Sequence, residues 1–232
     1  MSIESQYLRT PAWPHDIDGI DAGCTLIHPS SANGKTSLEE VMEGLNLAKE
    51  QIVTLNQVHK ARVLTTNEGG HFNGYDAVVT SKKGLCITIK IADCAAVLFI
   101  DPVRCILGAA HAGWRGAAAG IVPETVAAMK KLGADPLHMS VYLSPCISVK
   151  AFEVGEEVAS SFPENVVYRE NRSKKPHIDL KAFLKQQCTE LGILPKKVAV
   201  DPLCTVADDR CYSFRRQGGD AGRMIAFLRM AQ

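Results

Sequence analysis

The feature that most constrains the fold is a series of short segments, rich in β-branched and apolar residues, that begins near residue 52. Several of them are apolar without interruption, as expected for strands that are covered on both faces. Helical patterns occur among them, but strands and helices do not alternate strictly, which disfavours a doubly wound fold. We therefore predict an α+β fold with mixed β-sheets flanked by helices. The segments are IVTLNQV, RVLTT, DAVVT, CITIKI, AAVLFI, CILGAA, MSVYL, KVAV and MIAFL.

Local signals predict three helices and one hairpin. Residues 36–49 open with threonine and glutamate in the spacing of a capping box, and residues 179–191 carry an apolar stripe that ends at a glycine. An alanine-rich third helix starts either near Pro123, where a first-turn proline is tolerated, or near Gly116 with a kink at the proline. An aspartate and a proline between AAVLFI and CILGAA predict a hairpin turn.

Composition limits the classes of protein that remain. The chain has 232 residues, a hydrophobic fraction of 46% and a formal net charge of +1, which excludes intrinsic disorder and gives no general field for nucleic acid or anionic lipid. Its most apolar stretch, LCITIKIADCAAVLFI, is too short and too charged to span a membrane. The N-terminal residues lack the pattern of a secretory signal. We expect one domain over residues 1–232, cytoplasmic, with no nucleic-acid or membrane partner.

Three residues that can bind a metal each occur at the end of a probable strand. His59 follows IVTL, Cys94 lies between two apolar runs, and His111 precedes a glycine-rich turn. Two imidazoles and one thiolate form a borderline-soft ligand set that suits Zn²⁺ or copper, and three protein ligands leave a fourth position for water or substrate. Each residue alone is more often a packing residue, as most of the eight cysteines are expected to be. Spacing by itself leaves both interpretations open.

The segment AHAGWRG adds a candidate anion site. Gly113, Gly116 and the following helix can expose backbone N–H groups to an anion, and Arg115 can pair with that anion bidentately. Arg115 can equally be a solvated or ion-paired surface residue. Trp114 is expected to pack rather than to stack on a ligand.

Several blocks of the sequence resemble one known family. They run from about residue 50 to the C-terminus, and the elements QVH, ADC and HAGWRG in this order are specific. By these blocks the chain resembles the bacterial proteins first called multicopper polyphenol oxidoreductases, or laccase-domain proteins, and later reinterpreted as zinc-dependent purine nucleoside phosphorylases. The blocks are NQVHKARV, DAVVTSKKGLCITIKIADCAAVLFID, GAAHAGWRGAAAGIV, AFEVGEEV and DPLCT followed by CYSFRRQGGDAGRMIAFL.

The resemblance implies a fold, a metal site and an activity. The fold is a single α+β domain, and the implied metal ligands are His59, Cys94 and His111, in agreement with the chemical argument above. The implied activity is phosphorolysis of adenosine, inosine and methylthioadenosine, which releases the base and a ribose 1-phosphate. Adenosine deamination is also attributed to the family, and some bacterial members are implicated as amidases in peptidoglycan editing.

The chain departs from the family pattern at a few positions. Lys60 stands where glycine commonly follows the histidine of QVH, and Ala96 replaces proline in the ADC block. The loop GPxIGP reads SPCISV here, with Ser148 and Val149. The N-terminal block Thr-Arg-x-Gly-Gly-Val-Ser is replaced by TLIHPSSANGKTS, which predicts the loss of one substrate or phosphate contact.

The leading hypothesis is a zinc enzyme, with copper as the alternative metal, that acts on purine nucleosides and phosphate. Cys94 and His111 are its predicted catalytic residues, and Arg115 and Arg216 are its predicted substrate or phosphate ligands. Asp93 is expected to orient a ligand or accept a proton, or more often to serve a structural role.

Three other classes remain. The first is a Cys–His hydrolase with Cys94 as the nucleophile, because a thiolate near an imidazole is either a ligand or a nucleophile. The second is a copper oxidase of phenols. That chemistry generally needs several coppers, and the chain has seven histidines of which only two are well placed, so it does not easily hold them. The last is a binding module without catalysis, which a free ligand position beside an anion site disfavours.

Overall fold

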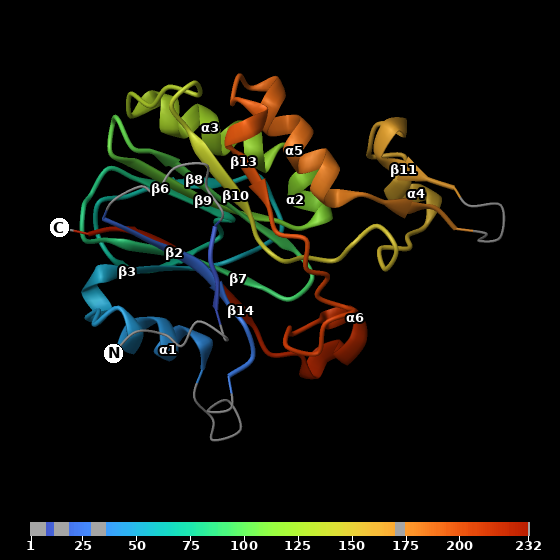
Figure 1. Cartoon of the computed structure of the whole chain (residues 1–232), viewed down its shortest axis with the longest axis horizontal. Helices are drawn as coiled ribbons and strands as arrows, with labels where there is room; N and C mark the ends of the chain where they lie inside the picture. The colour runs from blue at the N-terminus through green and yellow to red at the C-terminus, as the bar shows by residue number, and fades with distance from the viewer. Residues whose placement is uncertain (1–7, 12–18, 29–35, 170–174, 232) are drawn as a thin grey trace.

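Two six-stranded sheets form most of the computed structural model, which describes residues 8–11, 19–28, 36–169 and 175–231 (Figure 1). The first sheet has the order β1-β2-β14-β7-β3-β5 and the second the order β13-β10-β8-β9-β6-β4. In the first sheet β3 runs parallel to β5 and β7, while the other pairs are antiparallel. In the second sheet the outer pairs, β10 with β13 and β4 with β6, are parallel. The predicted α+β fold with mixed sheets is confirmed.

The strands of the first sheet are β1 (Leu8–Arg9), β2 (Ile20–Thr25), β3 (Ile52–Asn56), β5 (Gly70–Asn73), β7 (Cys86–Ile91) and β14 (Met224–Met230). Those of the second are β4 (Val63–Thr65), β6 (Ala77–Thr80), β8 (Ala95–Asp101), β9 (Ile106–Ala112), β10 (Ser140–Leu143) and β13 (Val198–Val200). A separate two-stranded ladder pairs β11 (Val167–Tyr168) with β12 (His177–Ile178).

The helices are α1 (Ser37–Gly44), α2 (Trp114–Ala118), α3 (Ile121–Lys131), α4 (Glu156–Ala159), α5 (Leu180–Glu190) and α6 (Phe214–Gln217). Short 3₁₀ turns lie at Lys49–Gln51, Glu164–Val166, Pro195–Lys197 and Gly218–Asp220. None of the helices in the described part of the chain has the length and apolarity needed to cross a bilayer.

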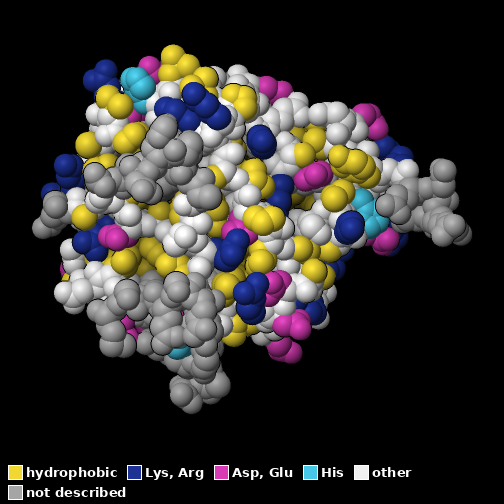
Figure 2. All heavy atoms as spheres, in the orientation of Figure 1, with side chains coloured by type: hydrophobic (Ala, Val, Ile, Leu, Met, Phe, Trp, Pro, Cys, Tyr) yellow, Lys and Arg dark blue, Asp and Glu magenta, His cyan; other side chains and the backbone are white. Residues whose placement is uncertain are grey.

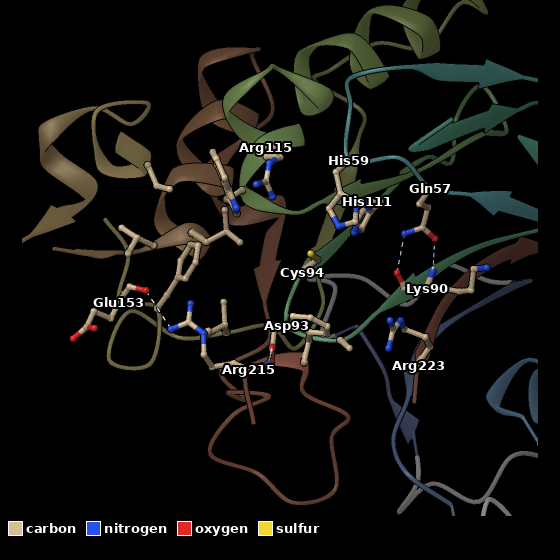
Figure 3. Close-up of a pocket in the computed structure, with 18 of the residues that line it drawn as sticks. Gln57, His59, Lys90, Asp93, Cys94, His111, Arg115, Glu153, Arg215 and Arg223 are labelled. Atoms are coloured by element: carbon tan, nitrogen blue, oxygen red, sulfur yellow. Dashed lines mark hydrogen bonds between the residues drawn. The ribbon is translucent and has the colours of Figure 1, made fainter. Parts of the chain in front are cut away.

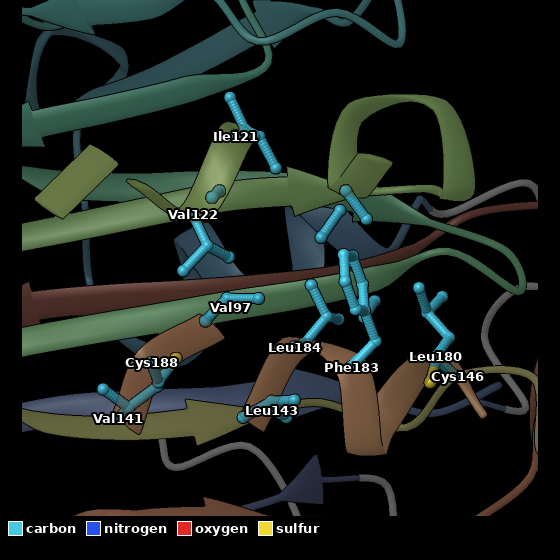
Figure 4. Packing of buried hydrophobic residues seen from close by; sticks show 14 of the residues in the cluster. Val97, Ile121, Val122, Val141, Leu143, Cys146, Leu180, Phe183, Leu184 and Cys188 are labelled. Carbon is cyan, nitrogen blue, oxygen red and sulfur yellow. The ribbon is translucent and has the colours of Figure 1, made fainter. Parts of the chain in front are cut away.

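Strand β8 shows why the predicted strands are apolar throughout. Ala96, Leu98 and Ile100 pack into the core between the two sheets, whereas Val97 and Phe99 pack into a second core under α3 and α5. Figure 4 shows Val97 in this second core, opposite side chains of α3 and α5. A smaller third core under α1 covers the outer face of the first sheet. Both faces of the central strands are therefore buried, as their sequence predicts.

The alanine-rich region forms two helices, α2 and α3, rather than one. The chain breaks at Gly120, whose φ of 86° lies in the left-handed region that glycine adopts most readily. Pro123 is the third residue of α3, in the first turn, where an N–H group has no partner within the helix. The alternative that started near Pro123 is the closer one.

The first predicted helix is shorter than expected. The capping box is present, because the Thr36 hydroxyl accepts a hydrogen bond from the N–H of Glu39, and the Glu39 carboxylate accepts one from the N–H of Thr36. However, α1 ends at Gly44, since Asn46 adopts a positive φ of 49° and turns the chain toward β3. The prediction of a helix through residue 49 was wrong.

The predicted hairpin joins β8 to β9. The Asp101 carboxylate accepts hydrogen bonds from the N–H groups of Val103 and Arg104, both at 3.0 Å, and so fixes the turn. On the surface of the face shown, basic and acidic side chains are interspersed with apolar and neutral ones, as the near-neutral charge predicts (Figure 2).

Candidate metal centre

The three predicted ligands come from separate segments that meet at one end of the two sheets. His59 lies in the turn after β3, Cys94 directly precedes β8, and His111 is the second-last residue of β9. Strands β8 and β9 pair with Ala96 opposite His111, which brings Cys94 close to His111. His59 and Asp93 have positive φ angles of 59° and 83°, which are uncommon for residues with side chains and are often retained at functional sites.

The ligand atoms of His59, Cys94 and His111 all lie within 4.8 Å of one another. The two imidazole rings meet edge to face with their centroids 4.7 Å apart, and the Cys94 sulfur faces both rings in Figure 3. His111 is buried, Cys94 is half-buried and His59 is exposed. Zinc bonds of about 2.0 Å to nitrogen and about 2.3 Å to sulfur at tetrahedral angles set the ligand atoms about 3.3–3.5 Å apart, so binding would draw them closer by about 1.5 Å at most. The donor set and its geometry therefore fit a tetrahedral ion with one side open to the cavity.

Asp76 holds two of the three ligands in place. Its buried carboxylate accepts a hydrogen bond from Nδ1 of His111 at 2.9 Å. The same carboxylate accepts the backbone N–H groups of Val58, His59 and Lys60, at 3.1, 2.8 and 2.8 Å. With Nδ1 of His111 as the donor to Asp76, Nε2 is left to face the ligand cluster.

The charge states in this cluster depend on one another. Burial opposes ionisation of Cys94, but hydrogen bonds from His111 and His59 outweigh it and lower the pKa of the thiol to about 6. Burial likewise opposes a charged His111, but Asp76 and Cys94 raise its pKa to about 9. Burial of Asp76 is outweighed by its hydrogen bonds from His111, Lys60 and His59, so its pKa is lowered. Without a metal, both shifts favour a thiolate on Cys94 beside a charged His111.

Gly113 leaves room for this cluster. A Cβ atom at this position would lie 2.7 Å from the Cys94 sulfur and 3.3 Å from Cδ2 of His59. Its φ is −68°, so the glycine is needed here for the close approach rather than for a left-handed backbone. Gly116 is buried, and an added Cβ would lie 3.3 Å from the carbonyl oxygens of His111 and Lys60. Both glycines therefore pack α2 against the ligand segments.

The ligands line a cavity of about 740 Å³ with two unlike halves. One half is bounded by apolar side chains of residues 147–158, α5 and α6, which include Phe152, Val154 and Phe214. The other half is bounded by polar residues where the strands of the first sheet end, which are Asn56, Gln57, Lys90 and Arg223. Figure 3 shows the ligands between these two sides.

Of the two predicted phosphate ligands, Arg115 lines the cavity and Arg216 does not. The Arg115 guanidinium is exposed and stacks over the Trp114 ring, 4.3 Å from its centroid. The Arg216 guanidinium donates to the backbone carbonyls of Thr205, Val206 and Cys211, at 3.0, 2.8 and 2.5 Å, and so holds the loop before α6.

Asp93 lines the cavity, but its carboxylate holds neighbouring segments together. One oxygen accepts the Thr205 hydroxyl and the other accepts the N–H of Arg215, both at 2.6 Å. Its carbonyl accepts the N–H of Ile147 at 3.0 Å. These contacts correspond to the structural role among the predicted alternatives.

Three residues of the site, Asp76, Arg215 and Arg223, were not predicted from the sequence. Arg215 follows the first residue of α6, and its guanidinium donates to the carbonyls of Ala151 and Glu153, both at 3.2 Å. Arg223 directly precedes β14. A carboxylate at the start of an apolar strand was the available signal for Asp76, whereas the two arginines reach the cavity only through the tertiary topology.

The fold and site together define an α+β protein with a His–Cys–His centre at the base of a two-sided cavity. Residues 27–231 match the family described as multi-copper polyphenol oxidoreductase laccase, and the chain belongs to this family. The resemblance seen in the sequence is thereby confirmed.

Relatives in this family carry the name of an enzyme. A protein of Deinococcus radiodurans named purine nucleoside phosphorylase is 36% identical over 189 residues, which cover 79% of this chain and 72% of that protein. A protein of Bacteroides thetaiotaomicron with the same name is 32% identical over 204 residues, covering 80% and 76%. The crystal structure of YlmD from Geobacillus stearothermophilus superposes with a TM-score of 0.83 at 25% identity over 93% of each chain.

Proposed function

We propose that this protein is a zinc-dependent purine nucleoside phosphorylase that acts on adenosine, inosine and methylthioadenosine. The observation that carries the proposal is the convergence of His59, Cys94 and His111 at the base of a cavity with one apolar half and several arginines. The names of the relatives support the same reaction class. We further propose that the protein acts in the cytoplasm, where its eight free cysteines would stay reduced.

The cluster would hold the metal through Nε2 of His111, an imidazole nitrogen of His59 and the Cys94 thiolate. When bound, zinc would polarise an oxygen of phosphate or substrate at its fourth position. Copper remains the alternative, because the same donor set suits both metals. Elemental analysis of gently purified protein distinguishes them.

The residues of the cavity supply binding and orientation. Arg115 and Arg215 would orient phosphate near the metal, and the side chains of Phe152 and Phe214 would hold the purine away from water. In phosphorolysis a phosphate oxygen forms a bond to C1′ of the ribose as the bond from C1′ to the base breaks. The electron pair of that bond leaves with the base, whose nitrogen takes up the proton that phosphate loses.

The test incubates the zinc-loaded protein with adenosine or inosine and phosphate, and measures base and ribose 1-phosphate. Product is expected, and it should be lost in His111→Ala. Inosine formed from adenosine without phosphate would reveal the deaminase activity that we propose as a second reaction of the same centre. Folded protein with full zinc that forms no ribose 1-phosphate would contradict the phosphorylase proposal.

One observation favours a second candidate, a cysteine hydrolase. Cys94, His111 and Asp76 form a chain of hydrogen bonds in the order nucleophile, base and orienting carboxylate. Stoichiometric zinc that protects Cys94 from alkylation would exclude this candidate. Rapid alkylation of Cys94 in metal-replete protein, with loss of amidase activity on a peptidoglycan precursor, would support it.

A further inference from the structure

The polar half of the cavity carries two cations, Lys90 and Arg223, that form no ion pair with a described carboxylate. Among the described residues, no acidic side chain lies within the 4.0 Å of an ion pair from Lys90, Arg115 or Arg223. The two acids that line the cavity have other partners. The Asp93 carboxylate accepts the Thr205 hydroxyl and the backbone N–H of Arg215, and Glu153 faces Lys175 and His177 at 3.7 and 3.9 Å. Within the described part of the chain, the cavity therefore has cations without an ion-pair partner on both sides of the predicted metal ligands.

Arg223 lies on the side of the ligands opposite Arg115 and Arg215. In Figure 3 its guanidinium points toward the cavity from the end of β14, whereas Arg115 and Arg215 approach from the apolar half. One nitrogen of Arg223 donates to the carbonyls of Ala221 and Gly222. This fixes the side chain, and its Nε and second terminal nitrogen have no hydrogen-bond partner among the residues that the structure describes.

The register of the first sheet places Lys90 beside Arg223. Strands β7 and β14 pair with Ile91 opposite Met224 and Lys90 opposite Ile225, so Lys90 and Arg223 are diagonal neighbours on one face of the sheet. Lys90 is the exposed residue of an otherwise buried strand. The Gln57 side chain clamps its backbone through two hydrogen bonds of 2.9 Å. Although the Lys90 side chain extends away from the ligands in Figure 3, it adds positive potential at this end.

We propose that Arg223, with Lys90 beside it, forms a second oxyanion subsite that binds a phosphoryl group carried by the substrate. The inference rests on the proposed function. In the proposed function, one half of the cavity holds both the phosphate, near Arg115 and Arg215, and the purine, against the apolar wall. The ribose then lies over the metal ligands, and its far end reaches the polar half. A nucleoside 5′-monophosphate would thus be a better ligand than the nucleoside.

The test compares the binding of adenosine 5′-monophosphate, adenosine and inorganic phosphate to the zinc-loaded protein by calorimetry. We expect the monophosphate to bind at least tenfold more tightly than adenosine, and more weakly as salt rises. Arg223→Gln should weaken monophosphate binding about ten- to a hundredfold, the range for a charge-assisted hydrogen bond, and leave adenosine binding within about twofold. Arg104→Gln, at the exposed tip of the β8–β9 hairpin, is the matched control and should change neither.

Because Arg223 also holds two carbonyls, Arg223→Lys separates a charge effect from a structural one. This variant should retain part of the preference for the monophosphate. Equal affinity of the wild type for monophosphate and nucleoside, or equal weakening of both in Arg223→Gln, would overturn the proposal. If Arg223→Gln weakens the binding of inorganic phosphate alone, the proposal is also overturned, because Arg223 would then bind the free phosphate that serves as co-substrate. If adenosine is not phosphorolysed but the monophosphate still binds through Arg223, the subsite stands and the proposed reaction fails.

Discussion

Asp76→Asn tests whether the centre depends on a carboxylate that does not touch the metal. The carboxylate is fully buried and accepts the N–H groups of Val58, His59 and Lys60 together with Nδ1 of His111. An asparagine is nearly the same size, so the substitution changes charge and hydrogen bonding rather than volume. Its amide has one acceptor oxygen, and its NH₂ group must face at least one of these donors.

The expected magnitude follows from these contacts. If the NH₂ group replaces Oδ2, the N–H of Lys60 loses its acceptor at 2.8 Å and meets a donor. A lost hydrogen bond to a charged group costs about 1.5–3 kcal/mol, and the metal-free protein should be destabilised by about that amount. The weaker partner also makes His111 a poorer ligand, so zinc affinity should fall about 10- to 100-fold, or about 1.4–2.8 kcal/mol.

Asp101→Asn is the matched control for this change. Asp101 is also fully buried, and its carboxylate accepts the N–H groups of Val103, Arg104 and Asp135 at the end of β8 opposite to Cys94. Zinc affinity is measured by competition with a chromophoric chelator, and stability by urea unfolding of the metal-free proteins. Both variants should lose stability, but only Asp76→Asn should lose zinc affinity. Wild-type zinc affinity in Asp76→Asn, or an equal loss in Asp101→Asn, would refute the reasoning.

Three further predictions concern the same region. Gly113→Ala places a Cβ 2.7 Å from the Cys94 sulfur, so zinc content measured by elemental analysis should fall in protein that remains folded by circular dichroism. In metal-free protein the pKa of Cys94 is lowered to about 6, so its thiolate forms as pH rises through about 6. The rate of Cys94 alkylation, followed by mass spectrometry, should therefore level off near neutral pH. Cys86 is the control, because its pKa is raised to about 12 and it should not react. Ala96→Pro removes the N–H that donates to the buried Ser144 hydroxyl at 2.9 Å, so it should lower the free energy of unfolding by about 1–3 kcal/mol, measured by urea titration. In a chain that already carries Ser144→Ala, the same substitution should cost less, because the hydroxyl that loses its partner is absent.

The central strands were predictable because their burial depends on composition alone. A run such as AAVLFI is apolar at every position, and β8 is buried at every position between two cores. Strand β5, with the sequence GHFN, lies at an edge and alternates between half-buried and exposed positions, so little in its composition indicates a strand. The end of α1 and the break at Gly120 depend on single backbone angles, which an apolar pattern does not encode.

The ligands were predictable for a different reason. Each of His59, Cys94 and His111 alone is more often a packing residue, but two imidazoles and a thiolate at strand ends, together with the family resemblance, indicated one shared site where spacing did not. Asp76 was not found, because its role depends on the pairing of β6 with β9. That register sets Ala77 opposite Ala110 and so brings Asp76 next to His111. An arginine that reaches the cavity from a distant segment, such as Arg223, is likewise invisible until the strand order is known.

The departures from the family pattern divide between the metal centre and the substrate region. At Lys60 a side chain is tolerated because the left-handed residue is His59, while Lys60 contributes its N–H to Asp76. Ala96 keeps the register opposite His111 and uses the N–H that proline would lack. Ser148 and Val149, by contrast, belong to the substrate region, because they directly follow Ile147, which lines the cavity. Residues 29–35 of the altered N-terminal block lie outside the described residues. Because the first two changes leave the ligand segments in place, we expect this chain to differ from its relatives in substrate preference rather than in metal binding.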